Sequence, residues 1–232
     1  MTLIVAIDGP AGTGKSSLAK MLSKQLNFIY VDTGAIYRAL ALLVDSYQID
    51  AADVDQVLTL IPHICVVCDK VEQRAKVTVD NKPVDKELRS EKISRLASIV
   101  SQHKRVREAL LPIQRNLVKQ IEGGAIFEGR DVGTVVFPKA QLKIFVTANS
   151  QTRALRRYEE LKDSTTSTYD EILQAIKNRD ERDEQRVNAP MQKASDAHVI
   201  DTSSMTLEQV IETALNLIRN TPQNLPKGSS LW

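Results

Sequence analysis

An eight-residue segment near the start of the chain combines the residue types that bind a phosphate chain. Residues 9–16 read Gly-Pro-Ala-Gly-Thr-Gly-Lys-Ser, which is the pattern of two glycines separated by four residues and followed by Lys and Ser or Thr. Glycines let backbone N–H groups turn toward phosphate oxygens, and a following helix adds the positive end of its dipole. A plain flexible loop is the alternative. Because the segment follows a predicted strand and opens a predicted helix, we favour a phosphate-binding loop, in which Lys15 neutralises charge and Ser16 can ligate Mg²⁺.

Two aspartates come shortly after predicted strands. Asp32 follows the second strand along the chain, and Asp131 lies beyond the third. Ligands of open α/β sheets bind at the carboxyl ends of the strands. Either residue could instead be a turn residue or a helix N-cap. Their position beside the phosphate-binding loop favours contact with Mg²⁺ or with substrate.

A charged segment at residues 168–186 carries arginines at helical spacing. Arg179, Arg182, Asp183 and Arg186 stand at i, i+3, i+4 and i+7, so they share one face of a helix. A solvated charged face is the ordinary explanation, and we expect the second half of this helix to be exposed. However, a lid over a phosphoryl-transfer site requires arginines whose guanidinium groups bind two phosphate oxygens at once.

These residues must be positioned by a sheet covered on both faces. Five short apolar runs, rich in β-branched residues and mostly without alternation, indicate buried parallel strands at residues 3–7, 28–31, 125–127, 142–146 and 198–200. A helix at 207–218 repeats its apolar residues behind a Thr206/Gln209 capping box. The pattern predicts an α/β fold with a parallel sheet.

Residues 63–84 break this alternation of strands and helices. Short extended runs there are joined by turns at Asp69-Lys70 and Asp80-Asn81, which predicts a small antiparallel insertion. Cys65 and Cys68 fall on one of its strands, where residues three apart point to opposite faces, so we predict neither a metal site nor a disulfide.

The composition limits the partners. The 232 residues carry a net charge of +2 and 4% aromatic residues, which favours no nucleic-acid polymer. The longest apolar runs fall far short of the ~20 residues that span a bilayer, and the N-terminus lacks the pattern of a signal peptide. We therefore expect a cytoplasmic protein without a membrane partner.

Five segments together resemble the bacterial cytidylate kinase family. They are residues 8–17 (Asp-Gly-Pro-Ala-Gly-Thr-Gly-Lys-Ser-Ser), 32–38 (Asp-Thr-Gly-Ala-Ile-Tyr-Arg), 105–110 (Arg-Val-Arg-Glu-Ala-Leu), 128–138 (Glu-Gly-Arg-Asp-Val-Gly-Thr-Val-Val-Phe-Pro) and 179–183 (Arg-Asp-Glu-Arg-Asp). The first is shared by many P-loop families, whereas 32–38 and 129–138 are highly specific to this one. The resemblance runs from about residue 4 to 219.

The resemblance implies a three-layer P-loop NTPase-type α/β fold with a five-stranded parallel sheet, a small antiparallel insertion that binds the nucleoside monophosphate, and a helical lid. It divides the chain into a core of residues 1–49 and 98–220, with the lid at about 158–190 inside it, and an insertion at 50–97. Residues 221–232 contain two prolines, a glycine and two serines, and we expect them to form a disordered tail.

The implied activity is transfer of the γ-phosphoryl group of ATP to CMP or dCMP, with Mg²⁺, by a monomer. By resemblance, ATP binds to Gly9, Pro10, Ala11, Gly12, Thr13, Gly14, Lys15, Ser16 and Ser17, and Mg²⁺ to Ser16 and, through water, to Asp32. The catalytic residues would be Lys15, Asp32, Arg130, Arg179 and Arg186. We also expect Arg105, Arg107 and Arg182 to contribute to the positive charge around the phosphates.

The family binds the CMP phosphate through residues that match Thr33, Arg38, Arg130 and Arg186, with Tyr37 beside it. It reads cytosine through Ser98, Arg107 and Asp131, and the ribose through Arg179 and Asp183. Thr33 departs from the pattern, where serine is common, but it keeps the hydroxyl group.

Two other functions remain as alternatives. One is a P-loop kinase of another small metabolite, such as adenylate or shikimate, against which the cytosine-reading residues Ser98, Arg107 and Asp131 argue. The other is a nucleotide-gated interaction module or an RNA-binding ATPase. Such a protein needs exposed aromatic residues or a basic surface, against which the 4% aromatic content and the net charge of +2 argue.

Overall fold

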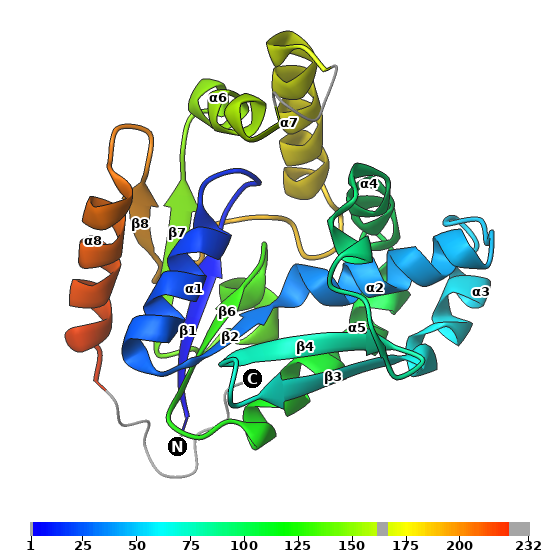
Figure 1. Ribbon diagram of the computed structural model, residues 1–232, viewed down its shortest axis with the longest axis horizontal. Coiled ribbons are helices and arrows are strands. Elements are labelled where there is room, and N and C mark those ends of the chain that lie inside the picture. Colours follow the sequence, from blue (N-terminus) through cyan, green and yellow to red (C-terminus); the bar gives the residue numbers. More distant parts are fainter. Residues whose placement is uncertain (1, 162–166, 223–232) are drawn as a thin grey trace.

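The computed structural model describes residues 2–161 and 167–222. It confirms the α/β fold, and the five predicted strands lie parallel in the order β2-β6-β1-β7-β8 (Figure 1), but the sheet of the described residues has eight strands rather than five. The strands are β1 (Leu3–Asp8), β2 (Ile29–Asp32), β3 (Ile64–Asp69), β4 (Arg74–Val79), β5 (Lys82–Pro83), β6 (Gly124–Glu128), β7 (Leu142–Thr147) and β8 (His198–Asp201). Within the described part of the chain, all eight belong to one sheet.

The insertion has the antiparallel strands that the sequence predicts, and it also extends the main sheet. β3 pairs antiparallel with β4, and β4 with β5. β4 in turn runs parallel to β2 and meets it at Tyr30 and Arg74, so the insertion continues the sheet at one edge. Positive φ angles at Asp80 and Asn81 form the predicted turn between β4 and β5.

Helices connect the strands and cover both faces of the sheet. They are α1 (Lys15–Leu26), α2 (Thr33–Ser46), α3 (Val54–Thr59), α4 (Glu91–Val100), α5 (Lys104–Asn116), α6 (Ser150–Leu161), α7 (Tyr169–Glu184) and α8 (Leu207–Arg219). Short turns of helix are η1 (Ile61–His63), η2 (Glu87–Arg89), η3 (Leu117–Gln120) and the π-helical η4 (Val132–Val136). No helix among the described residues is both long and apolar enough to cross a membrane.

Alternate residues of the central strand β1 face two separate cores. Val5 and Ile7 pack with α1 and α8, while Ile4 and Ala6 pack with α2 and α5. Both sets are fully buried, which explains why the strand reads as a continuous apolar run. The layers therefore leave only the ends of the strands free for a site.

The helices α6 and α7, the second of which lies within the predicted lid, are beyond the carboxyl ends of the strands, above the loops that follow β1 and β6 (Figure 1). Thr168 and Glu171 form the predicted capping box that starts α7. Of the predicted lid, residues 162–166 lie outside the described residues, as do 223–232 of the predicted tail.

Truncation of a core ring should cost much of the stability. Phe127 is fully buried and packs against Phe137 with ring centroids 4.6 Å apart. Phe127→Ala is expected to lower the free energy of unfolding by about 3–5 kcal/mol. Val71→Ala is the control, because Val71 is 93% exposed, and it should change stability by less than about 0.5 kcal/mol. Urea titration followed by circular dichroism measures both, and a small loss for Phe127→Ala would contradict the packing described.

Candidate active site

The phosphate-binding loop joins the end of β1 to the start of α1, as its sequence predicts. Gly9 has a φ of +139°, and a Cβ there would lie 2.0 Å from the carbonyl oxygen of Val146, so only glycine fits. Gly14, in the left-handed region with φ +86°, is the N-cap of α1. The N-terminal N–H groups of α1 are thereby directed at the mouth of the loop.

Lys15 begins α1 and turns back onto its own loop. Its ammonium group donates to the carbonyl of Pro10 and to Thr13 Oγ1. Burial, together with the nearby Arg130, holds the pKa of Lys15 well below its usual value. A buried, partly compensated cation of this kind favours the approach of an anion.

Glu128 opens the 128–138 motif, but the sequence analysis assigned it no role in the site. It ends β6, and its Oε1 accepts from Ser16 Oγ and from the Tyr30 hydroxyl, each at 2.7 Å. Its Oε2 is buried without a hydrogen-bond partner. Burial, and then the neighbouring Asp32, raise the pKa of this carboxyl. Its position at a strand carboxyl end, the signal applied to Asp32 and Asp131, could have found it.

These oxygens fit a magnesium ion. The unpartnered Glu128 oxygen lies beside the Ser16 hydroxyl and close to Asp32, and hard oxygen ligands of this type are what Mg²⁺ takes alongside phosphate oxygens and water. Among the described residues, no group of three or more His, Cys, Asp or Glu side chains could hold a metal ion by itself. The donor set therefore suits a cation delivered with a polyphosphate.

Asp32 is a helix N-cap, which was the alternative considered for it, and it also faces the central pocket. Its carboxylate caps α2 by accepting from the backbone N–H of Ala35 at 3.0 Å, and it pairs with Arg38 at 2.5 Å. Thr33 donates from its hydroxyl to the carbonyl of Glu128 at 2.7 Å. The added methyl group of Thr33 is accommodated, and both residues line the central pocket.

The residues predicted to read a base lie together. Arg107 is buried, donates to the Asp131 carboxylate and to the carbonyl of Ser101, and lies over the ring of Tyr37 at 5.3 Å. Arg107 Nε and Ser98 Oγ are buried without a hydrogen-bond partner. A polar ligand edge would satisfy them.

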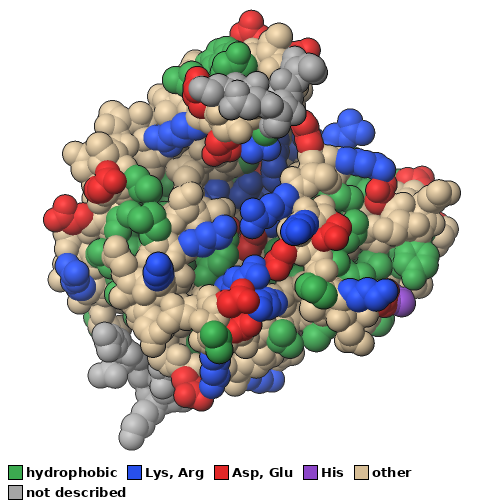
Figure 2. Space-filling model, viewed as in Figure 1, with side chains coloured by type: hydrophobic (Ala, Val, Ile, Leu, Met, Phe, Trp, Pro, Cys, Tyr) green, Lys and Arg blue, Asp and Glu red, His purple; other side chains and the backbone are tan. Residues whose placement is uncertain are grey.

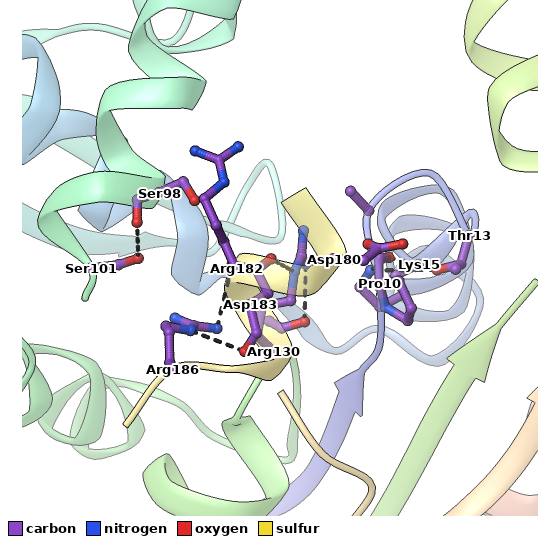
Figure 3. A network of polar contacts seen from close by, with 12 residues as sticks. Pro10, Thr13, Lys15, Ser98, Ser101, Arg130, Asp180, Arg182, Asp183 and Arg186 are labelled. Atoms are coloured by element: carbon purple, nitrogen blue, oxygen red, sulfur yellow. Dashed lines mark hydrogen bonds and ion pairs between the residues drawn. The ribbon is translucent and has the colours of Figure 1, made fainter. Parts of the chain in front are cut away.

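The end of α7 brings Asp183 against Arg130 and Arg186 (Figure 3). Asp183 is 4% exposed, accepts from Arg130 Nε at 3.0 Å and lies 3.6 Å from Arg186 Nη2. Burial would raise the pKa of Asp183, but Arg130, Arg186 and Arg179 together hold it below its usual range. Burial and the charge of Arg130 lower the pKa of Arg179 to about 10.

Two expectations about arginines were wrong, and a third holds only in part, because Arg182 acts on Arg179 from outside the pocket. The second half of the 168–186 segment is not a solvated face, because Asp183 and Arg186 are buried against the loop after β6. Arg105 pairs instead with Asp55 on the surface, at 2.7 Å. Arg182 donates to the carbonyl of Asn178 and does not line the pocket. Fewer arginines of this segment therefore line the pocket than their helical spacing predicts.

One pocket of about 230 Å³ brings the predicted substrate residues together. Its lining includes Thr33, Tyr37, Arg38, Ser98, Arg107, Arg130, Asp131, Arg179, Asp183 and Arg186, together with Ala11, Gly12, Lys15, Ser16, Asp32 and Glu128. A second cavity of about 830 Å³ shares Gly12, Lys15 and Ser16 with the first and is also lined by Thr13, Gly14 and Ser17, among others. Gly9 and Pro10 line neither cavity. Figure 2 shows Lys and Arg side chains gathered in the hollow at the centre of this face.

Unsatisfied polar atoms concentrate in the smaller pocket. Among the described residues, the buried side-chain atoms without a hydrogen-bond partner are Ser98 Oγ, Arg107 Nε, Glu128 Oε2, Thr134 Oγ1, Arg179 Nε, Asp180 Oδ1 and Arg186 Nη2. All but Thr134 and Asp180 belong to residues that line it. Since such atoms are costly in a finished core, the arrangement suits an anionic ligand with a polar edge.

Comparisons with known proteins agree on one family. The family model described as cytidylate kinase matches residues 5–220. The chain is 42% identical to the cytidylate kinase of Caldicellulosiruptor saccharolyticus, over 92% of this chain and 94% of that one. It is 41% identical to the cytidylate kinase of Vibrio vulnificus strain CMCP6, over 94% and 96%. The structure of an uncharacterized protein from Eubacterium ventriosum matches at a TM-score of 0.51 and 12% identity, over 94% and 99%, which concerns the fold alone.

Asp8 should make stability depend on pH. It ends β1, accepts from the N–H groups of Val132 and Gly133, and has no cationic partner among these contacts. Burial raises its pKa from 3.8 to about 6. The folded state therefore binds this proton more tightly than the unfolded state, so the contribution of Asp8 to stability is largest below pH 4 and is lost as the pH rises to about 6.

Asp8→Asn removes this titration. The free energy of unfolding of the wild type, minus that of Asp8→Asn, is expected to fall by about 2.4 kcal/mol between pH 4 and pH 7, at 1.36 kcal/mol per pKa unit. Denaturant titrations of both proteins across that range measure the difference. A difference that stays constant with pH would show that Asp8 ionises normally in the folded protein.

Proposed function

Because the chain belongs to the cytidylate kinase family, we propose that it transfers the γ-phosphoryl group of ATP to CMP and dCMP, giving ADP and CDP or dCDP. One observation on this structure, independent of its relatives, supports the proposal. The ten residues predicted for CMP line a single pocket beside the phosphate-binding loop, and several of them bring unsatisfied polar atoms to it. We expect the reaction in the cytoplasm, where both nucleotides are available.

The two cavities suggest that ATP and CMP bind at different places around the phosphate-binding loop. We place ATP with its phosphates on the loop of residues 9–17 and its adenosine in the larger cavity, which also contains Met205 and Leu207. CMP would occupy the smaller pocket, with its base at Ser98, Arg107 and Asp131. The phosphates of both then converge at Lys15, which borders both cavities.

The acceptor needs no general base. A phosphate monoester with a second pKa near 6 is already largely dianionic at neutral pH, so catalysis consists of positioning the reactants and stabilising charge. Lys15, Arg130, Arg179 and Arg186 would supply positive charge around the transferred group. Asp183 would hold two of these arginines, Arg130 and Arg186, in the pocket through its carboxylate.

Ser16, Glu128 and Asp32 are the residues proposed to hold Mg²⁺, the first directly and the carboxylates through water. When bound, the cation would neutralise charge on the phosphate chain and help to fix its geometry. Glu128 also orients the Ser16 hydroxyl by accepting its hydrogen bond.

A coupled assay of ADP release tests the proposal. The protein is given ATP and Mg²⁺ with CMP, dCMP, UMP, AMP or shikimate in turn. We expect CMP and dCMP to have the highest kcat/KM. Preference for AMP or shikimate would favour another metabolite kinase, and ADP release that is independent of every acceptor would favour an ATPase module.

Replacing Lys15 should abolish most of the activity while leaving the protein folded. Lys15→Ala removes a preorganised charge whose loss typically costs 10²-fold or more in turnover. Because Lys15 contacts only its own loop through hydrogen bonds, we expect the variant to remain folded. Thermal unfolding and turnover are measured on the same preparation. A folded variant that keeps more than about a tenth of wild-type turnover would contradict the assignment.

Base preference should depend on Asp131. A carboxylate can only accept a hydrogen bond from the cytosine amino group, whereas an amide can donate to the uracil carbonyl. Asp131→Asn should therefore lower the ratio of kcat/KM for CMP to that for UMP. The Arg107 contact also changes in this variant, so the ratio, rather than either rate, is the measure. An unaltered ratio would show that Asp131 reads no base.

A further inference from the structure

Arg153 contacts the phosphate-binding loop at Ala11 and also lines the larger cavity. It is 5% exposed, near the start of α6. Its Nε donates to the carbonyl of Ala148 at 2.9 Å, and its Nη1 donates to the carbonyl of Ala11 at 3.1 Å. The guanidinium group is thus fixed to the end of β7 and to the loop that holds phosphates.

The same nitrogen of Arg153 also forms an ion pair with Asp180, on α7. Asp180 Oδ2 lies 2.6 Å from Arg153 Nη1, and the two side chains are 13% and 6% exposed. Asp180 Oδ1 is buried without a hydrogen-bond partner. Burial raises the pKa of Asp180 in spite of the attraction of Arg153. This pair therefore differs from a solvated surface ion pair, because its members have lost water to reach each other.

Two carboxylates fasten the same end of α7 to two different parts of the site. Asp183 binds Arg130, which follows β6, and Asp180 binds Arg153, which is joined to the phosphate-binding loop. Arg179 is the neighbour of Asp180 in the chain and lines the pocket. Since one nitrogen of Arg153 bonds both Ala11 and Asp180, a shift of the loop alters the support of α7 directly.

We propose that Arg153 and Asp180 are positioning residues that set the lid on the phosphate-binding loop, so that Arg179 reaches the transferred phosphoryl group. The inference rests on the proposed function, since it assigns a purpose to the place of Arg179. Asp180 lines neither cavity, so its effect has to act through the residues that it holds. Small displacements of a catalytic group cost large factors in rate, which is why such a support is needed.

The first experiment measures the lid without substrate. Hydrogen exchange of α7 amides is followed in the nucleotide-free wild type, in Asp180→Ala and in Glu184→Gln. Glu184 is an exposed acid on the same helix and serves as the matched control. Asp180→Ala is expected to speed exchange in the second half of α7 by about tenfold or more, while Glu184→Gln leaves it unchanged. Unchanged protection in Asp180→Ala would overturn the proposal.

The second experiment asks whether the effect acts through Arg179. Asp180→Ala should lower kcat for CMP phosphorylation by about tenfold or more, and Glu184→Gln should not. If Asp180 works by placing Arg179, the double variant Arg179→Ala/Asp180→Ala should be no slower than Arg179→Ala alone. Multiplying effects would show two independent roles and overturn the proposal.

The two proposals fail in different ways. If the wild type does not phosphorylate CMP, the proposed function fails, whatever the exchange data show. If the wild type is active and Asp180→Ala retains its kcat, only the positioning role fails. Arg153→Lys provides a second variant, because one ammonium group cannot reproduce the fork that serves three acceptors. It should show the same non-additivity with Arg179→Ala, and multiplying effects would again contradict the inference.

Discussion

Positive charge crowded into a small buried pocket is the constraint on which the rest of the site depends. Burial and mutual repulsion lower the pKa values of Lys15, Arg179 and Arg186. Asp183 is the carboxylate that holds Arg130 and Arg186 there. Without an anion the arrangement is unfavourable, and a phosphate group relieves it. The free energy lost in folding the site is thus recovered on binding.

The fold concentrates these groups because the central strands end at one edge. β1 delivers the loop with Lys15, and β6 delivers Glu128 and Arg130 beside it. Close approach is possible only because small residues stand between them. A Cβ at Gly129 would lie 2.6 Å from Thr33 Oγ1 and 2.7 Å from Val132 Cγ2. The motif after β6 is therefore required for packing, in addition to the substrate contacts proposed for its residues.

The sequence predicted what depends on local pattern. Continuous apolar runs marked the five parallel strands, and the glycine pattern marked the loop. Exposure of the 168–186 helix was predicted wrongly, because a charged face indicates polarity but does not say whether water or a counter-charge meets it. Glu128 stands in a recognised motif, but its role was not predicted because its partners Ser16 and Tyr30 are distant in sequence. The joining of β4 to β2 is likewise a long-range pairing that alternation cannot reveal.

The most direct test of stored electrostatic repulsion is the stability of Arg179→Met in the presence and absence of CMP. Methionine keeps most of the side-chain volume and removes the charge whose pKa is lowered to about 10. Without nucleotide, we expect the variant to be more stable than the wild type by about 1–3 kcal/mol, and saturating CMP should stabilise it less than it stabilises the wild type. A variant that is less stable than the wild type without nucleotide would contradict the account, because Arg179 would then stabilise the fold rather than the bound phosphate.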